Sequence, residues 1–324
     1  MSAPPSSGLS SSSAFAPASV SNVACGFDCL GFAVDGLGDE VVAEIREEPG
    51  VAIVEMTGDG GRLPRDAARN TAGVAVRSLL AAAGFETARV GIALRVHKRM
   101  PLASGLGSSA ASGVAAARAA AEGLGIEPER ELLLRCALEG ERVACGSAHP
   151  DNVTPSLYGG LVLIRSAEPL DVVELPVPEG LFCALIRPHV EVETRAAREA
   201  LGSEVELAAA ARQWANLGAL ISALYTENWR LLSRSLVDAV AEPKRRHLVP
   251  GFGTVQEAAR EAGALGCSFS GSGPTVFALC RGHAAAEVAA EAMAEAARRS
   301  GGLECDAATS RVGAEGVRLL PSPG

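Results

Sequence analysis

Lysine is almost missing from this chain of 324 residues: it occurs only at positions 98 and 244, so arginine carries nearly all of the positive charge. Acidic residues outnumber basic ones by 38 to 29, which leaves a net charge of −9. Such a chain has no basic surplus for a phosphate backbone, and this excludes a nucleic-acid-binding role. Aromatic residues make up only 4%, yet 48% of the chain is hydrophobic, enough for a large core in one or two domains.

Cysteine pairs of the Cys-x-x-Cys type are also missing, although the chain has eight cysteines. No signal peptide is recognisable, and no run of about 18 apolar residues could span a membrane. Scattered cysteines without a secretory signal are typical of reduced, buried thiols. We therefore expect a cytoplasmic protein without membrane contact.

The order of expected elements indicates two lobes. Residues 1–14 are rich in serine and proline and are expected to form a disordered tail, too short and uncharged for a transit peptide. The segments 39–45 and 51–56 are expected to pair as a hairpin. Because strands and helices are mixed irregularly, the expected fold class is α+β, with lobes formed by residues 15–168 and 169–324.

A segment rich in glycine and serine, residues 101–111, lies between an alternating stretch at 89–96 and an alanine-rich run. A strand, a loop and a helix N-terminus in this order are typical of phosphate binding. The free N–H groups of the first helical turn face the anion, and the helix dipole attracts it. No lysine follows the last glycine, which excludes a Walker A loop, and a turn that caps a core helix remains the alternative. The candidate ATP-binding residues are Pro101, Leu102, Ala103, Ser104, Gly105, Leu106, Gly107, Ser108, Ser109, Ala110 and Ala111.

Two other segments place polar side chains among small residues. Residues 17–31 include Asn22 and Asp28, and in isolation this pattern indicates only turn chemistry. Residues 146–155 place His149, Asp151 and Asn152 between an expected helix and an expected strand. Two potential ligands from one loop, without a third, are a weak indication of a metal site.

Three glycine-rich segments, residues 17–31, 101–111 and 268–275, resemble in order and spacing the motifs of a small-molecule kinase superfamily. Its members are galactokinase, homoserine kinase, mevalonate kinase and phosphomevalonate kinase (the GHMP kinases). The second motif, Pro-x-x-x-Gly-Leu-Gly-Ser-Ser-Ala-Ala, is the most diagnostic. The resemblance implies a two-lobed GHMP kinase fold, with a ribosomal protein S5 domain 2-like N-terminal lobe that binds ATP and a ferredoxin-like C-terminal lobe.

Within this superfamily the chain is similar to the homoserine kinases from about Phe15 to its C-terminus. The resemblance implies ATP-dependent phosphorylation of the side-chain hydroxyl of L-homoserine, a step toward threonine, by a homodimer. The matching features are Ser21-Asn22, Gly26-Phe27-Asp28, His149-x-Asp151-Asn152, Thr194-x-x-Ala197-Arg198, Glu242-Pro243-x-Arg245 and Ser270-Gly271-Ser272-Gly273-Pro274-Thr275.

The chemistry of a small zwitterionic substrate agrees with these residues. Its ammonium group needs an anion, for which Asp28 is suited, and its carboxylate needs cations. Arg198 and Arg245 suit the carboxylate, since the planar guanidinium binds it through two parallel hydrogen bonds. The resemblance places further residues in the same substrate site, namely Asn22, His149, Asn152, Thr194 and Gly273.

The resemblance also implies a Mg²⁺ site formed by Glu141 and Ser109, and a hard dication prefers such oxygen ligands. Glu141 is favoured over Glu139 because of its spacing from His149. Asn70 is the candidate for contact with adenine, and a helix N-cap role for it is equally open.

The catalytic residues implied by the resemblance are Asn152, Glu141 and Arg198. Asn152 stands where related kinases carry an aspartate, and an amide cannot act as a base. Catalysis is therefore expected to rest on positioning and charge neutralisation, with the γ-phosphate as proton acceptor. Asp151 is adjacent in sequence, and whether it faces the site stays open at this point.

One departure and two alternatives complete the prediction. Ala24-Cys25-Gly26 stands where many family members have Gly-Pro-Gly, so Cys25 is expected to be a thiol near the site. A sibling kinase acting on mevalonate, a sugar or shikimate is the first alternative, and the paired Arg198 and Arg245 favour an amino-acid substrate over it. The second is a non-catalytic nucleotide-binding sensor, which the presence of Glu141 and both arginines disfavours.

Overall fold

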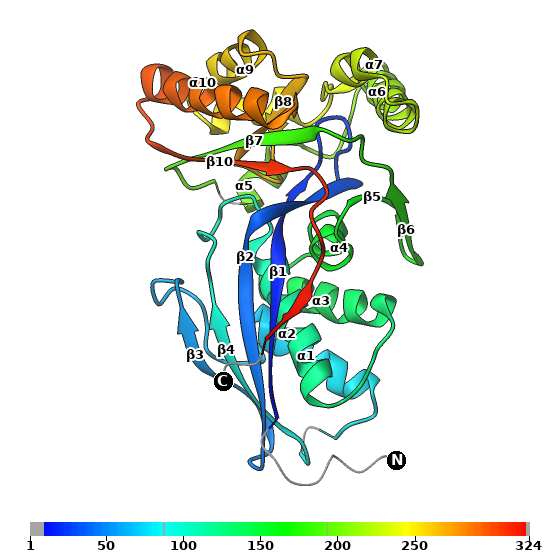
Figure 1. The fold of residues 1–324 in the computed structure, drawn as a ribbon, viewed down its shortest axis with the longest axis vertical. Coiled ribbons are helices and arrows are strands. Elements are labelled where there is room, and N and C mark those ends of the chain that lie inside the picture. Colours follow the sequence, from blue (N-terminus) through cyan, green and yellow to red (C-terminus); the bar gives the residue numbers. More distant parts are fainter. Residues whose placement is uncertain (1–9, 87, 193, 322–324) are drawn as a thin grey trace.

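The computed structural model describes residues 10–86, 88–192 and 194–321, and within these ranges it does not describe the side chains of residues 144, 145, 194 and 195. Two β-sheets lie one above the other along the long axis of the molecule (Figure 1). The described part of the chain contains no helix that is both long enough and apolar enough to cross a membrane.

The lower sheet has seven strands, and its main path runs β11-β1-β2-β4-β3, with β5 paired to β2 and β6 paired to β5. All of its pairs are antiparallel except β3 with β4. The strands are β1 (Ser11–Ser21), β2 (Leu30–Arg46), β3 (Gly50–Thr57), β4 (Gly91–His97), β5 (Leu161–Ala167), β6 (Leu170–Leu175) and β11 (Arg318–Leu320).

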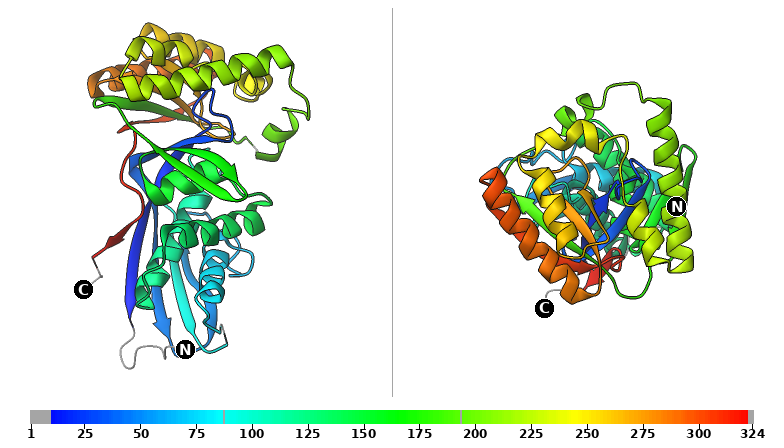
Figure 2. Two further views of the ribbon diagram at one scale, coloured as in Figure 1. Left: turned by 90° about the vertical axis from the view of Figure 1, so that its right-hand side faces the viewer. Right: turned by 90° about the horizontal axis from the view of Figure 1, so that it is seen from above.

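Four helices cover one face of the lower sheet (Figures 1 and 2). They are α1 (Thr71–Ala82), α2 (Ser108–Gly123), α3 (Arg130–Cys145) and α4 (Pro150–Tyr158). Helix α2 is almost completely buried, and its core-facing residues are mainly alanines. Small side chains let this helix pack closely against β1 and β2. Its N-terminus is thereby held rigidly at the upper end of the lobe.

The upper sheet is antiparallel and has the strand order β10-β7-β9-β8. In chain order this is 4-1-3-2, with helices in the connections, so the ferredoxin-like C-terminal lobe expected from the sequence is confirmed. Its strands are β7 (Leu181–Pro188), β8 (Gly266–Phe269), β9 (Val276–Arg281) and β10 (Cys305–Arg311). Its helical elements are α5 (Thr194–Glu199), α6 (Leu207–Thr226), α7 (Trp229–Ser235), α8 (Glu242–Arg245), the 3₁₀ turn η1 (Arg246–Leu248), α9 (Phe252–Glu261) and α10 (His283–Gly301).

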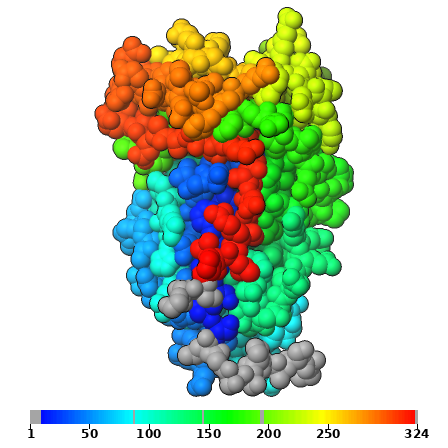
Figure 3. All heavy atoms as spheres, in the orientation of Figure 1, coloured from blue at the N-terminus to red at the C-terminus, as the bar shows by residue number. Residues whose placement is uncertain are grey.

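The lobe boundaries differ from the expectation. Strand β1 begins at Ser11, so residues 11–14 belong to the sheet and not to a tail. Strand β6 pairs with β5 in the lower sheet, although a boundary at residue 168 would separate the two. The C-terminal segment also returns to the lower sheet, where β11 pairs with β1 and lies over the N-terminal strand on the surface (Figures 1 and 3).

The expected hairpin between residues 39–45 and 51–56 is wrong. Both segments are strands, as parts of β2 and β3, but β4 lies between them in the sheet and pairs with β3 in parallel. The three-residue connection between β2 and β3 is therefore not a hairpin turn.

Candidate active site

A cleft of about 310 Å³ lies where the two lobes meet, and its volume is in the range of small-molecule sites. It is lined by segments from both lobes: the loop after β1, the starts of α1, α2 and α4, the last turns of α3, and residues of α5, α8 and the β8–β9 loop. The predicted site residues that line it are Asn22, Asp28, Asn70, Leu102, Ala103, Ser104, Gly105, Gly107, Ser108, Ser109, Ala110, Glu141, His149, Asn152, Arg198 and Arg245.

The glycine-rich loop forms one end of the cleft. Gly107 is the N-cap of α2 with a φ of 67°, and no side chain caps the free N–H groups of the first turn. A Cβ on Gly107 would lie 2.3 Å from Ser19 Oγ and 3.1 Å from Asn152 Oδ1, so only glycine fits. Three of the eleven predicted loop residues do not line the cleft: Leu106 and Ala111 are buried in the core, and Pro101 is exposed.

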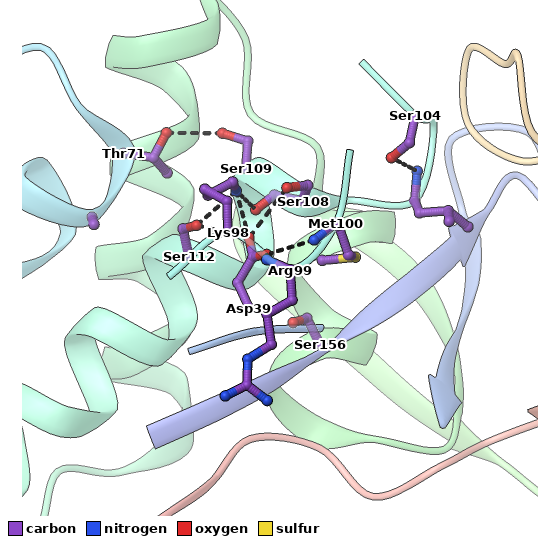
Figure 4. Close-up of polar contacts among 12 residues, drawn as sticks. Asp39, Thr71, Lys98, Arg99, Met100, Ser104, Ser108, Ser109, Ser112 and Ser156 are labelled. Atoms are coloured by element: carbon purple, nitrogen blue, oxygen red, sulfur yellow. Dashed lines mark hydrogen bonds and ion pairs between the residues drawn. The ribbon is translucent and has the colours of Figure 1, made fainter. Parts of the chain in front are cut away.

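The base of this loop is closed by a buried ion pair that the sequence analysis missed (Figure 4). Lys98 Nζ contacts Asp39 Oδ2 and donates to the Ser108 carbonyl at 2.7 Å and to Ser112 Oγ at 2.8 Å. The Asp39 carboxylate accepts from the backbone N–H of Arg99 at 3.0 Å, before the loop, and from the Ser108 and Ser112 hydroxyls at 3.2 and 2.9 Å, after it. Both ends of the loop are thereby fixed to one carboxylate on β2.

The third glycine-rich segment holds the loop from the C-terminal lobe. Thr275 Oγ1 donates to the Ser104 carbonyl and Ser270 Oγ donates to the Gly105 carbonyl, each at 2.6 Å. Gly273 does not line the cleft. It instead packs against the loop, since a Cβ on Gly105 would lie 2.7 Å from the Gly273 carbonyl oxygen. In this structure Gly273 supports the glycine-rich loop and does not contribute to the surface of the cleft.

The cleft also gathers the charged residues that were predicted to bind a zwitterion. Asp28 and Arg198 form a two-point ion pair, with N–O distances of 2.6 and 2.9 Å. Arg245 is 5% exposed, and its Nε donates to the Ala197 carbonyl at 2.9 Å. Burial, together with the positive charge of Arg198, lowers the pKa of Arg245. Both guanidinium groups lie over the Phe27 ring, at 5.5 and 5.2 Å from its centroid.

Asn22 and His149 support this charged group. The Asn22 amide donates to the Gly271 carbonyl at 2.7 Å, and its oxygen accepts from the Asp28 N–H at 2.9 Å. Asn22 therefore fixes the backbone that carries Asp28. Burial and the charge of Arg198 lower the pKa of His149, so its imidazole is neutral at pH 7. Thr194 is the first residue of α5, and its side chain lies outside the described part of the structure.

The start of α4 brings two side chains to the cleft. Asn152 Oδ1 accepts from the Ser19 hydroxyl at 3.4 Å and lies beside Gly107. Asp151 also lines the cleft, although the prediction left its direction open. It is 3% exposed, and burial, reinforced by the charge of Asp28, raises its pKa to about 7.

Glu141 and Ser109 line the cleft beside the loop, and Glu141 is 4% exposed. The Ser109 hydroxyl lies 2.8 Å from Thr71 Oγ1 (Figure 4). A buried carboxylate and a hydroxyl are suitable ligands for Mg²⁺, which commonly keeps several waters and binds substrate phosphates. Glu139, by contrast, does not line the cleft and pairs with Arg142 at 2.6 Å. No group of three acidic, histidine or cysteine side chains that could hold a metal ion occurs among the described residues. A Mg²⁺ site that is completed by water and substrate phosphates needs fewer protein ligands.

Asn70 and Cys25 differ in their relation to the cleft. Asn70 caps α1, because its side-chain oxygen accepts from the Ala72 N–H at 3.0 Å, and it also lines the cleft. The N-cap role is confirmed, whereas contact with adenine stays a prediction. Cys25 is 1% exposed, does not line the cleft, and burial raises its pKa to about 12. Cys25 therefore does not contribute its thiol to the surface of the cleft, although its neighbours Asn22 and Asp28 line it.

Comparison with known proteins identifies the family. The family model described as the GHMP kinases N terminal domain matches residues 70–160, and the one described as GHMP kinases C terminal matches residues 220–299. The chain belongs to the GHMP kinases. Each match includes one side of the cleft: the first contains the glycine-rich loop, Glu141 and Asn152, and the second contains Arg245 and the β8–β9 loop.

Relatives of this GHMP kinase support the assignment over nearly the full length. It is 48% identical to homoserine kinase from Chlorobium phaeovibrioides over 314 aligned residues. The alignment covers 94% of this chain and 98% of the relative. The crystal structure of homoserine kinase from Cytophaga hutchinsonii matches with a TM-score of 0.93 at 47% identity, covering 98% of this chain and all of the other. Galactokinase from Lactococcus lactis, complexed with galactose, shares the fold at 16% identity, with a TM-score of 0.73 and coverage of 96% and 95%. The two-lobed GHMP kinase fold expected from the sequence is confirmed.

Proposed function

We propose that this GHMP kinase transfers the γ-phosphoryl group of ATP to the side-chain hydroxyl of L-homoserine and forms O-phospho-L-homoserine, a step toward threonine. The near-full-length relatives named homoserine kinase support this assignment. The observation that carries it is that one cleft is lined both by Asp28, Arg198 and Arg245 and by the glycine-rich loop.

The cluster of Asp28, Arg198 and Arg245 suits the amino-acid portion of the substrate. The Asp28 carboxylate and the Arg198 guanidinium compensate each other without substrate. A zwitterion that enters between them offers an ammonium group to the carboxylate and a carboxylate to the guanidinium, so every charge remains paired. Arg245, which is buried and lies over the same ring as Arg198, adds a second cation for the substrate carboxylate.

The glycine-rich loop suits the nucleotide. The free N–H groups of the first turn of α2 would bind the phosphates, and Asn70, which lines the same cleft, would contact adenine. Glu141 and Ser109 would hold Mg²⁺, which neutralises phosphate charge when bound. We propose that the residues of this chain act mainly by positioning and charge stabilisation, since phosphoryl transfer has a loose transition state. Asn152, which lies beside Gly107 in the cleft, would orient the hydroxyl but cannot accept its proton.

An ADP-release assay tests the proposal directly. The purified protein is given ATP and Mg²⁺ with L-homoserine, mevalonate, shikimate, galactose or no acceptor. We expect turnover only with L-homoserine. Turnover with another alcohol would indicate a sibling kinase, and ATP binding without turnover would indicate a sensor.

Variants of Asp28 and Arg245 test the substrate site within the same assay. Asp28→Asn and Arg245→Ala should each raise the KM for L-homoserine at least tenfold while the KM for ATP changes little, because each removes a charge-assisted contact. Arg212→Ala, at an exposed position on α6, is the matched control. Equal effects of all three variants would contradict the assigned substrate site.

The proposal also includes a cytoplasmic location and a homodimer, both implied by the resemblance. The seven cysteines at described side-chain positions are free thiols, which suits a reducing compartment. Light scattering of the purified protein measures the oligomeric state.

A further inference from the structure

Helix α6 is almost without charge, although it lies at the surface. Among its 20 residues only Arg212 is charged. The helix lies at the outer side of the upper lobe and packs mainly against α7 (Figures 1 and 2). A surface helix normally places charged and polar side chains on the face that points away from the core. The composition of α6 is instead that of a helix with neighbours on more than one face.

Two apolar rows run along α6. The inner row faces the lobe, where Leu220 and Leu224 are 1% and 2% exposed. The outer row, here called the outer seam, alternates steps of four and three residues and comprises Leu207, Ala211, Trp214, Gly218, Ile221 and Tyr225. Leu207, Trp214 and Tyr225 are 74%, 63% and 62% exposed. Alternating steps of three and four residues are the pattern of helices that pack side by side along their length.

The outer seam lies within the main concentration of exposed apolar side chains. Eight large hydrophobic residues are exposed in the described part of the chain. Five of them lie on α6 or next to it: Val205, Leu207, Trp214, Tyr225 and Val237. Val237 lies beside the middle of the helix, because its carbonyl accepts from Asn216 Nδ2 at 3.0 Å. Single exposed hydrophobic residues are ordinary, whereas a group of them marks an interaction surface.

Gly218 gives the outer seam a gap that nothing in the described chain fills. Glycines inside other helices have close neighbours: a Cβ on Gly73, Gly113 or Gly140 would lie 2.4, 3.0 or 2.7 Å from another atom. A Cβ on Gly218 would meet no described atom within 4 Å, and the φ of Gly218 is not left-handed. Glycine weakens a helix interior relative to alanine. The gap therefore suits a large side chain that comes from outside this chain.

We propose that α6 is the interface of a homodimer, in which it packs antiparallel against α6 of a second copy and Trp214 fills the gap at the partner's Gly218. The inference rests on the homodimer named in the proposed function and adds its location. It does not depend on the proposed reaction.

The outer seam is complementary to itself when its direction is reversed. In a two-fold interface each contact occurs twice, since both subunits use the same surface. A two-fold axis level with Asn216 places Leu207 against the partner's Tyr225. It also places Ala211 against the partner's Ile221, which is half-buried on its own lobe. Together with tryptophan against glycine, two of the three kinds of contact then join a large side chain to a small one.

A parallel pair of helices lacks this complementarity. It would place Trp214 against the partner's Trp214 and Gly218 against the partner's Gly218, which crowds one layer and empties the next. The single charge on α6 also leaves a charged partner without counter-charges. Stable interfaces bury about 800 Å² of each partner around an apolar core. The outer seam, about 30 Å long, would be that core, with Val205 and Val237 extending it.

Sedimentation equilibrium of the wild type and of matched variants tests the interface. The wild type should show twice the chain mass of 33.0 kDa. Trp214→Glu and Gly218→Leu should each raise the Kd of the dimer about 10²-fold or more. Gly218→Leu is decisive, because it adds apolar surface and favours the helix but closes the gap. Trp214→Ala combined with Gly218→Leu should recover at least tenfold of that loss. Val288→Glu, at a 55% exposed position on α10, is the control and should keep the wild-type Kd.

Tryptophan fluorescence tests the same contact without a disruptive substitution. The chain has only two tryptophans, Trp214 and Trp229. Dilution of the wild type should shift its emission to the red as Trp214 becomes exposed to water. Trp214→Phe, which retains only Trp229, should show no such shift.

Other results would overturn the inference. A wild-type dimer whose Kd is unchanged by Trp214→Glu, or tightened by Gly218→Leu, would place the interface elsewhere or show non-specific association. Should a variant fail to fold, as circular dichroism would reveal, a wild-type dimer without the emission shift would refute the interface. A wild type that is monomeric at every concentration would refute the homodimer as well and leave the outer seam to another protein. Failure to phosphorylate L-homoserine would refute the proposed reaction and not the interface.

Discussion

Replacing Asp151 with asparagine should make the protein more stable. Asp151 is 3% exposed, and its pKa rises from 3.8 to about 7 on folding, because burial, and then the charge of Asp28, disfavour its ionised form. The folded state therefore binds this proton more tightly than the unfolded state does. Stability linked to Asp151 is complete below about pH 4 and is lost as the pH rises through 7.

The size of the effect follows from the two pKa values. One pKa unit corresponds to about 1.4 kcal/mol, so the rise of about 3 units costs the wild type about 4 kcal/mol at pH 8 and about 1.5 kcal/mol at pH 5. An asparagine at position 151 has no charge to bury and does not incur this loss. Its amide donors need partners in the cleft, which offsets about 1 kcal/mol at both pH values.

Urea denaturation of the wild type and of Asp151→Asn at pH 5 and pH 8 measures the effect. The variant should exceed the wild type in free energy of unfolding by about 3 kcal/mol at pH 8 and by less than about 1 kcal/mol at pH 5. The difference between the two pH values cancels contributions that are the same in both proteins. Equal stabilities at pH 8, or a variant that is less stable there, would show that Asp151 is compensated in the folded state and would refute the reasoning.

Three further variants test other parts of the site. Gly107→Ala should raise the Kd for ATP at least tenfold, measured by calorimetry, because its Cβ would lie 2.3 Å from Ser19 Oγ at a φ of 67°. Lys98→Met should lower the free energy of unfolding by about 3–5 kcal/mol, since it leaves the buried Asp39 carboxylate without its counter-ion, and Lys98→Met combined with Asp39→Leu should recover part of this loss. Glu141→Ala should lower kcat about 10²-fold and raise the Mg²⁺ concentration needed for half-maximal rate. A magnesium dependence identical to that of the wild type would exclude Glu141 as a ligand.

The parts of the site that could be predicted from the sequence are those encoded by local patterns. A glycine-rich loop before an alanine-rich run specifies a helix with an open N-terminus, and α2 begins at Ser108 as that pattern requires. Asp28, Arg198 and Arg245 were brought to one site by resemblance, and the structure places all three in the cleft. Their mutual pairing was not predictable, because the contact between Asp28 and Arg198 joins residues 170 positions apart.

The parts that were missed depend on long-range pairing. Asp39 and Lys98 are separated by 59 positions and meet only because β2 pairs with β4. The same strand order made the hairpin prediction wrong, since β4 comes later in the chain but inserts between β2 and β3. The one local signal for the ion pair was the rarity of lysine. Lys98 is one of only two lysines in the chain and directly precedes the glycine-rich loop, which makes it a candidate for a specific role.

The two carboxylates of the cleft, Asp28 and Asp151, are held in opposite electrostatic states. Asp28 is partly exposed and paired, so a zwitterionic substrate can replace Arg198 as its partner at little electrostatic cost. Asp151 is buried and has no ion-pair partner among the described residues, and burial raises its pKa to about 7. A paired carboxylate is a poor proton acceptor, whereas a buried one without a counter-ion gains free energy when it takes a proton.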